Sequence, residues 1–248
     1  MWTLRALSRV LPGLLPGLLP GLLPSSCALC GQRCPGVVCD GCRADAVRPR
    51  TRCRRCANPL APRDAAAGRD CGACVAAPPA FDATVVAADY QAPFDQLVLQ
   101  LKFGAGLPLA PWFATLLRDQ ALRDPATAGA LPDVLAPVPL GRRRLAERGF
   151  NQALEVARPL SRMLGVALDA RLATRVLETA PQSAVAPAAR AANVRAAFAI
   201  TAPVAGLHVG IVDDVMTSAR TLDALASALK QAGALRVSNY VVARTPPK

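Results

Sequence analysis

The sequence predicts an α/β fold, in which helices flank a mainly parallel sheet and a small cysteine-rich module precedes it. Two observations support this prediction. From residue 81 onward, strand-like apolar runs alternate with helix-like segments, which is typical of a parallel sheet. Before that point, four Cys-x-x-Cys pairs lie in a stretch with almost no apolar periodicity. The 248 residues are enough for one large domain and one small module.

The predicted elements follow one another along the chain. Short apolar runs predict strands at 84–90, 134–138, 207–212 and 237–242. Longer segments with apolar residues at helical spacing predict helices at 94–103, 107–122, 151–164 and 221–232. We expect Pro159 to bend or interrupt the third of these helices, because proline cannot donate the backbone hydrogen bond.

Three stretches differ in composition and predict the domain organisation. Residues 1–24 contain a PGLL repeat, residues 25–80 form the cysteine-rich module, and residues 81–248 form the α/β domain. Prolines recur every four residues in the repeat, which disfavours both a membrane helix and a signal peptide. We therefore expect no membrane span and a cytoplasmic protein.

The chain is strongly basic, with a formal net charge of +12 that is concentrated near its N-terminus. Such a charge favours a polyanionic partner, either nucleic acid or a phosphorylated metabolite. The alternative is that the charge serves solubility. A single histidine, His208, excludes histidine-rich metal sites.

The cysteines predict two structural zinc sites, because two Cys-x-x-Cys pairs supply the four thiolates of a tetrahedral ion. The simplest assignment is sequential, although cross-braced pairing, disulfides or an iron–sulfur cluster are alternatives, and Cys34 is expected to be free. One site would then use Cys27, Cys30, Cys39 and Cys42, and the other Cys53, Cys56, Cys71 and Cys74.

An apolar strand ends at Asp213 and Asp214, and a helix is predicted to begin shortly afterwards. Ligands of parallel sheets bind beyond the carboxyl ends of strands, and a helix N-terminus suits a phosphate group. The two carboxylates suit ribose hydroxyls or Mg²⁺, and the following hydroxyls of Thr217, Ser218 and Thr221 add donors. The alternative is a solvated turn followed by an ordinary helix cap.

A second candidate segment holds four arginines within seven residues, beside Gly141. Guanidinium groups match pyrophosphate, and the same pattern also fits a solvated basic face or a contact with a phosphodiester backbone. These arginines are Arg142, Arg143, Arg144 and Arg148.

The segment IVDDVMTSART resembles the phosphoribosyl pyrophosphate (PRPP) motif of type I phosphoribosyltransferases, with Ser218 and Ala219 in place of Thr and Gly. Almost the whole chain beyond residue 25 resembles the ComF family of competence proteins, which combine a double zinc ribbon with a phosphoribosyltransferase-like domain. The matching pieces are the four cysteine pairs, the acidic segment and the stretches 88–104, 138–153 and 178–198.

The resemblance implies a type I phosphoribosyltransferase-like fold that binds PRPP with Mg²⁺. Asp213 and Asp214 would hold the ribose, the arginine segment and Lys102 the pyrophosphate, and Arg190 would act from a closing lid. The 5-phosphate would lie against Thr217, Ser218, Ala219, Arg220 and Thr221. If the backbone of Ala219 has a positive φ, its Cβ costs about 1–2 kcal/mol.

Two functions are compatible with these residues. One is transfer of a phosphoribosyl group to an unknown acceptor, linked to DNA uptake and natural transformation. The other is a non-enzymatic competence factor that keeps a degenerate PRPP pocket. Its partner would be nucleic acid, such as single-stranded DNA, or the DNA-uptake machinery.

Overall fold

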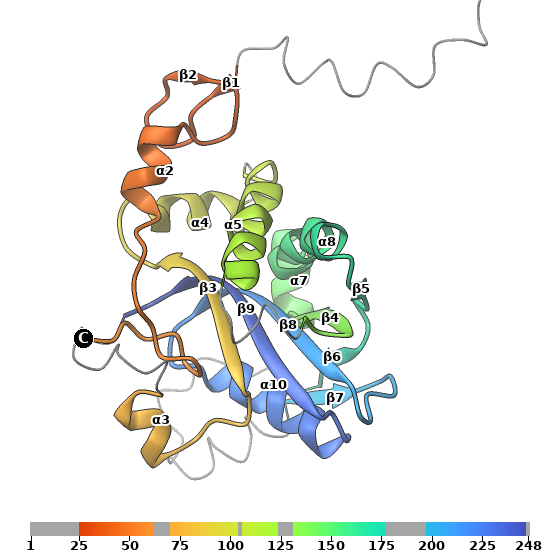
Figure 1. The fold of residues 1–248 in the computed structure, drawn as a ribbon. Coiled ribbons are helices and arrows are strands. Elements are labelled where there is room, and N and C mark those ends of the chain that lie inside the picture. Colours follow the sequence, from red (N-terminus) through yellow and green to blue (C-terminus); the bar gives the residue numbers. More distant parts are fainter. Residues whose placement is uncertain (1–24, 62–69, 104–105, 124–130, 177–196, 247–248) are drawn as a thin grey trace, which may run out of the picture. The chain divides into compact units, whose positions relative to one another are not determined.

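The computed structural model describes residues 25–61, 70–103, 106–123, 131–176 and 197–246 (Figure 1). The chain divides into two compact units, Met1–Asp45 and Ala46–Lys248. The division falls between the two predicted metal sites, so the second cysteine cluster belongs to the same unit as the sheet. Each unit is described by itself below.

The first unit contains a short hairpin followed by a helix. Strand β1 (Ser25–Ser26) pairs antiparallel with β2 (Arg33–Cys34), and α2 (Asp40–Ala46) follows. The Ser25 hydroxyl donates to the Cys34 carbonyl at 2.6 Å across this hairpin. The elements described in this unit are too short to enclose a sizeable apolar core by themselves.

The second unit is built on a five-stranded parallel sheet with the order β3-β9-β8-β4-β5. Its central strands are nearly continuous apolar runs because helices cover both faces of a parallel sheet. The strands are β3 (Ala83–Asp89), β4 (Val134–Pro137), β5 (Ala167–Leu168), β8 (His208–Met216) and β9 (Arg236–Arg244).

Helices cover the sheet on both sides (Figure 1). One face carries α4 (Phe94–Lys102), α5 (Leu109–Arg123) and α8 (Gln152–Leu164). The other face carries α10 (Arg220–Gln231) together with the antiparallel pair β6 (Ala173–Arg175) and β7 (Phe198–Ile200). The predicted α/β fold with a mainly parallel sheet is confirmed.

Three details differ from the prediction. Helix α8 runs through Pro159 without ending there. Strand β8 extends to Met216, beyond the apolar run that predicted it. Two short helices were not expected, α3 (Gly72–Ala76) and α7 (Arg142–Arg148).

The middle of the sheet is tightly packed around Gly210 in β8. A Cβ atom at Gly210 would lie 2.5 Å from Cδ2 of Leu135 and 3.1 Å from a ring carbon of Tyr240. Leu135 and Tyr240 are both fully buried, so glycine lets β4 and β9 pack closely against β8. This packing fixes the strand that carries the two aspartates.

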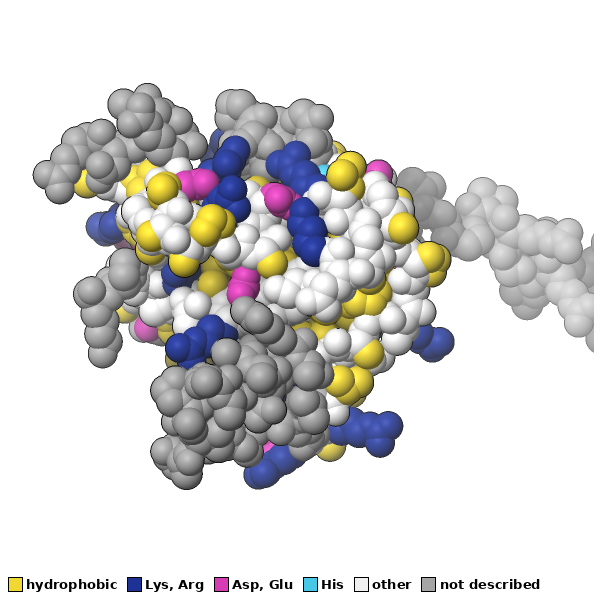
Figure 2. All heavy atoms as spheres, turned by 90° about the horizontal axis from the view of Figure 1, so that it is seen from below, with side chains coloured by type: hydrophobic (Ala, Val, Ile, Leu, Met, Phe, Trp, Pro, Cys, Tyr) yellow, Lys and Arg dark blue, Asp and Glu magenta, His cyan; other side chains and the backbone are white. Residues whose placement is uncertain are grey.

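The described surface is mixed in charge. Figure 2 shows Lys and Arg side chains in several separate places on one face of the molecule, with acidic side chains beside some of them. Among the residues that the structure describes, no helix combines the length and the apolar character that crossing a bilayer requires.

Candidate functional site

A cavity of about 290 Å³ lies in the second unit, where β4 and β8 end. Its lining includes Asp213 and Asp214 from β8, Val138 after β4, and the first residues of α8. Because all strands of the sheet run in parallel, their carboxyl ends meet at one edge, where ligands of such sheets bind. The cavity therefore lies where the sequence predicted a binding site.

The two aspartates have different hydrogen-bond partners. The Asp214 side chain is buried, and its Oδ2 accepts a hydrogen bond from Nε2 of Gln152 at 2.9 Å. Asp213 Oδ1 accepts a hydrogen bond from the backbone N–H of Asp214 at 2.9 Å. Burial, together with the negative charge of Asp214, raises the pKa of Asp213 well above the usual carboxyl value. Two carboxyl groups this close to each other favour binding of a cation or of a ligand that donates hydrogen bonds.

The N-terminus of α8 reaches the same cavity through Asn151 and Gln152. Asn151 caps the helix by accepting from the N–H of Ala153 at 3.0 Å, and its Nδ2 donates to the Val138 carbonyl at 3.0 Å. Gln152 is buried, and its Oε1 has no hydrogen-bond partner among the described residues. An acceptor in this state calls for a donor from a ligand or from water. The sequence interpretation did not assign a role to either residue.

Lys102 comes from the last turn of α4 and lines the cavity. Its Nζ lies 3.5 Å from Oδ2 of Asp214, and 5.9 Å from the centre of the Tyr90 ring. Its positive charge acts to lower the pKa of Asp213, opposing the effect of burial. Lys102 is therefore an electrostatic partner of the acidic pair.

The segment 217–221, beside the aspartates, contains the loop after β8 and the first two residues of α10. Thr217 and Thr221 line the cavity, whereas Ser218, Ala219 and Arg220 are not among its lining residues. Ala219 has φ 62° and ψ −4°, which is the left-handed conformation that favours glycine. Ala219 therefore has the positive φ at which its Cβ is expected to cause backbone strain.

The arginine segment forms a short helix, α7 (Arg142–Arg148). Helical geometry points its side chains in different directions. Arg144 and Arg148 line the cavity, but Arg142 and Arg143 are not among its lining residues. Arg143 instead pairs with Glu147 at 2.8 Å on the exposed surface. The sequence could not distinguish the arginines that line the cavity from those that do not, because this segment has no apolar face that would indicate its orientation.

Two further arginines bear on the cavity: one lines it without having been expected there, and the other was expected there but lies outside the described residues. Arg175, in β6, lines it and was missed, since nothing in its sequence context distinguishes it. Its guanidinium carbon lies 5.5 Å from the centre of the Phe198 ring. Arg190, expected to act from a lid, lies outside the described residues.

The cysteines come together in two tetrads, in the sequential grouping. Within each tetrad the four Sγ atoms lie within 4.8 Å of one another, which suits one tetrahedral ion. The first tetrad contains Cys27, Cys30, Cys39 and Cys42, and the second contains Cys53, Cys56, Cys71 and Cys74. Cys34 is outside both and donates to the Gly36 carbonyl at 2.8 Å.

The two tetrads repeat one backbone arrangement. The N–H of Cys39 donates to Sγ of Cys27 at 3.4 Å, and the N–H of Cys71 donates to Sγ of Cys53 at 3.2 Å. The hydrogen bond with Cys56 is the main cause that lowers the pKa of Cys53 to about 4, and the same bond raises the pKa of Cys56. One thiolate thus opposes ionisation of the next, and a divalent ion would relieve that repulsion.

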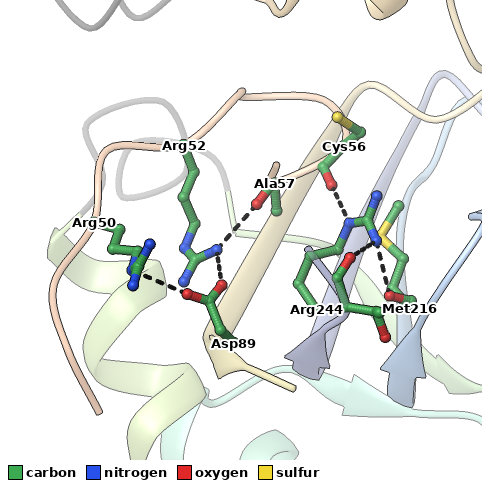
Figure 3. Close-up of polar contacts among 8 residues, drawn as sticks. Arg50, Arg52, Cys56, Ala57, Asp89, Met216 and Arg244 are labelled. Carbon is green, nitrogen blue, oxygen red and sulfur yellow. Dashed lines mark hydrogen bonds and ion pairs between the residues drawn. The ribbon is translucent and has the colours of Figure 1, made fainter. Parts of the chain in front are cut away.

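Arginines connect the second tetrad to the sheet (Figure 3). Arg52 donates to Oδ1 of Asp89 at 2.7 Å and to the Ala57 carbonyl at 3.2 Å. Arg244, at the end of β9, is buried and donates to the Cys56 and Met216 carbonyls at 2.8 and 3.0 Å. Burial lowers the pKa of the Arg244 guanidinium.

Comparisons with known proteins give one family model and solved structures that are similar to parts of the chain. The family described as phosphoribosyl transferase domain matches residues 149–248. A purine phosphoribosyltransferase from Pyrococcus horikoshii resembles the chain with a TM-score of 0.34 and 18% identity, over 54% of this chain and 83% of that one.

Two curated relatives match most of the sequence. DNA utilization protein YhgH of Salmonella typhimurium is 38% identical over 210 residues, which are 84% of this chain and 90% of the relative. Competence protein F of Haemophilus influenzae is 28% identical over 212 residues, with the same coverage of both chains. The chain therefore belongs to the ComF family of competence and DNA-utilization proteins.

Proposed function

We propose that this protein binds PRPP with Mg²⁺ in the cavity at the ends of β4 and β8 and transfers its phosphoribosyl group to an acceptor, in a process linked to DNA uptake and natural transformation. The observation that carries the proposal is the pairing of two adjacent carboxylates with a helix N-terminus across one cavity. A sugar phosphate needs both, because its hydroxyls donate to acids and its phosphate accepts from amides.

Each part of the ligand has a counterpart in the chain. Asp213 and Asp214 accept from the ribose hydroxyls, and Oε1 of Gln152 is an acceptor for another donor. The amides and hydroxyls of Thr217 and Thr221, the two residues of the 217–221 segment that line the cavity, hold the 5-phosphate. The remaining phosphates, which form the leaving pyrophosphate, lie toward Arg144, Arg148 and Lys102.

The reaction is a substitution at C1 of the ribose. A nucleophilic atom of the acceptor, nitrogen in the usual case for this fold, forms a bond to C1 while the bond from C1 to the pyrophosphate oxygen breaks. The leaving group takes the bonding electrons, and the arginines stabilise its negative charge. Mg²⁺ supplies further neutralisation of the pyrophosphate, and the carboxylate pair is the donor set that suits it.

The cysteine tetrads hold two structural zinc ions, one in each unit. Four thiolates around each ion leave no open coordination position, so the zinc supports folding and takes no part in catalysis. The N-terminal module has too small a core to fold without such support. We place the protein in the cytoplasm, where PRPP is available and reduced thiolates persist.

The test is calorimetric titration of the zinc-loaded protein with PRPP in the presence of Mg²⁺. We expect saturable binding, and we expect Asp213→Asn to weaken it at least tenfold, because the amide replaces an acceptor oxygen with an NH₂ group that can only donate. Asp169→Asn is the matched control, since Asp169 is not among the residues that line the cavity. Absence of binding to the wild-type protein, or equal loss in both variants, would falsify the proposal.

A second candidate function is binding of nucleic acid along a groove in the same unit. A cavity of about 300 Å³ runs along the edge strand β3 and is lined by Arg48, Arg50, Arg52, Arg54 and Arg123. The first four are alternate residues of the single segment 48–54. Arg50 and Arg52 share Asp89, and Arg54 shares Asp70 with Arg55, so part of this positive charge is neutralised. Arginines in such a groove match a phosphodiester backbone.

Fluorescence anisotropy with a labelled single-stranded oligonucleotide tests this second function. Reversing the charge of Arg123 with Arg123→Glu should weaken binding and reduce its dependence on salt concentration. Arg162→Glu makes the same change of charge on the exposed surface of α8 and is the control. Equal effects of the two substitutions would assign the binding to overall charge.

A further inference from the structure

The second tetrad lies in the same apolar core as the elements that flank the 217–221 segment. Cys53, Cys56 and Cys74 are buried in one cluster with Met216, at the end of β8, and Leu222, in the first turn of α10. The tetrad is thus packed beside the proposed phosphate-binding segment rather than in a separate module. The first tetrad lies in the other unit.

One buried side chain, that of Arg244, bridges the second tetrad and the 217–221 segment. Nε of Arg244 donates to the Cys56 carbonyl at 2.8 Å, and Nη1 donates to the Met216 carbonyl at 3.0 Å (Figure 3). Nη1 also donates to the Thr217 carbonyl at 2.6 Å. The guanidinium is planar and rigid, so fixing one of its edges fixes the other. The cysteine knuckle and the start of the 217–221 segment are therefore held by the same group.

The charge of Arg244 points to the same connection. Only 6% of the residue is exposed, and among the described residues its hydrogen bonds go to backbone carbonyls and not to a carboxylate. A buried cation needs a compensating charge nearby. Four thiolates around a divalent ion carry a net negative charge, and the tetrad that includes Cys56 has the donor set for it.

We propose that Arg244 is a positioning residue that couples metal binding at the second tetrad to the order of the 217–221 segment. The proposal rests on the proposed function, in which this segment holds the 5-phosphate. Metal fixes the knuckle at Cys56, and Arg244 then holds the carbonyls of Met216 and Thr217. The amides that follow are thereby preorganised before a ligand arrives.

The test measures hydrogen exchange of backbone amides in the full-length, zinc-loaded protein without any ligand. Cys71→Ser disables the second tetrad, and Cys39→Ser makes the corresponding change in the first. Metal analysis should find each variant one ion short. We expect amides of 217–222 to exchange at least tenfold faster in the Cys71→Ser variant and at the wild-type rate in the Cys39→Ser variant.

Two further variants keep all eight metal ligands. Arg244→Lys and Arg244→Met should retain both ions yet show the same faster exchange at 217–222, because neither side chain can bridge both sets of carbonyls. Wild-type exchange in these variants overturns the proposal. So does faster exchange spread equally over β8 and β9, because the metal would then support the whole sheet and not one segment.

The exchange experiment separates this inference from the function on which it rests. Failure of PRPP to bind the wild-type protein, with the expected exchange pattern, refutes the proposed ligand but leaves the coupling in place. PRPP binding of equal strength to the wild-type protein and the Cys71→Ser variant, with unchanged exchange, refutes the coupling alone.

Discussion

Replacing Ala219 with glycine should stabilise the protein, because Ala219 has a positive φ of 62°. An L-residue with a Cβ costs about 1–2 kcal/mol in this conformation. Glycine removes that strain but adds about 0.4–1 kcal/mol of conformational freedom to the unfolded chain. It also loses part of the contact of one methyl group, worth about 0.8 kcal/mol when fully buried. The net expectation is a stabilisation of about 0.5 kcal/mol.

Valine at the same position should have the opposite effect, because a β-branched side chain is a severe outlier at positive φ. We therefore expect the free energy of unfolding to rank Ala219→Gly above the wild-type protein and Ala219→Val lowest. Urea denaturation of the zinc-loaded protein measures this order, and the glycine variant should melt about 1–2 °C higher.

Ala57 provides the matched control, since it also has a positive φ, of 55°, but is fully buried. Ala57→Gly loses the whole contact of its methyl group, about 0.8 kcal/mol, so its net effect should be close to zero or destabilising. The reasoning is refuted if Ala219→Gly destabilises the protein by about 0.5 kcal/mol or more, which is outside the usual range of substitutions that disturb no special feature. Greater stability of the valine variant would refute it equally.

Three other predictions follow from single contacts. Gln152→Leu removes the hydrogen bond to Asp214 and should weaken PRPP binding in calorimetry, with little change in melting temperature. Gly210→Ala places a Cβ against Leu135 and should lower the free energy of unfolding in urea by about 1–3 kcal/mol. Burial lowers the pKa of His208, so the unfolded chain takes up a proton before the folded one as the pH falls below about 6.5. The wild-type protein should therefore lose stability relative to His208→Gln between about pH 7 and pH 5, and an unchanged difference would contradict this assignment.

The sequence was sufficient to predict the central elements, because the strands of a buried parallel sheet are short apolar runs between periodic helices. It misjudged the end of β8, since Asp213 and Asp214 interrupt the apolar pattern although the pairing with β9 continues beyond them, with Asp213 opposite Val241 and Val215 opposite Ala243. Helix α7 was missed because seven mostly charged residues with no apolar face do not show a helical period.

The candidate site was predicted in part, and for a clear reason. Acidic residues at a strand end and hydroxyls before a helix are visible in the sequence, so Asp213, Asp214 and Thr217 could be proposed. The role of Gln152 was not visible, because it depends on how the N-terminus of α8 packs against β8. The position of the second tetrad beside the sheet also could not be read from composition, which changes at residue 80 and not where the contacts divide the chain.

The position of β9 in the sheet has a consequence for the synthesis of the protein. It is the last of the described strands in the sequence, yet it lies between β3 and β8 and supplies Arg244. Until the ribosome has released this strand, the edges of β3 and β8 that it later covers have no partner. Such exposed edges are prone to wrong pairing, so the nascent chain is most vulnerable to aggregation just before β9 emerges.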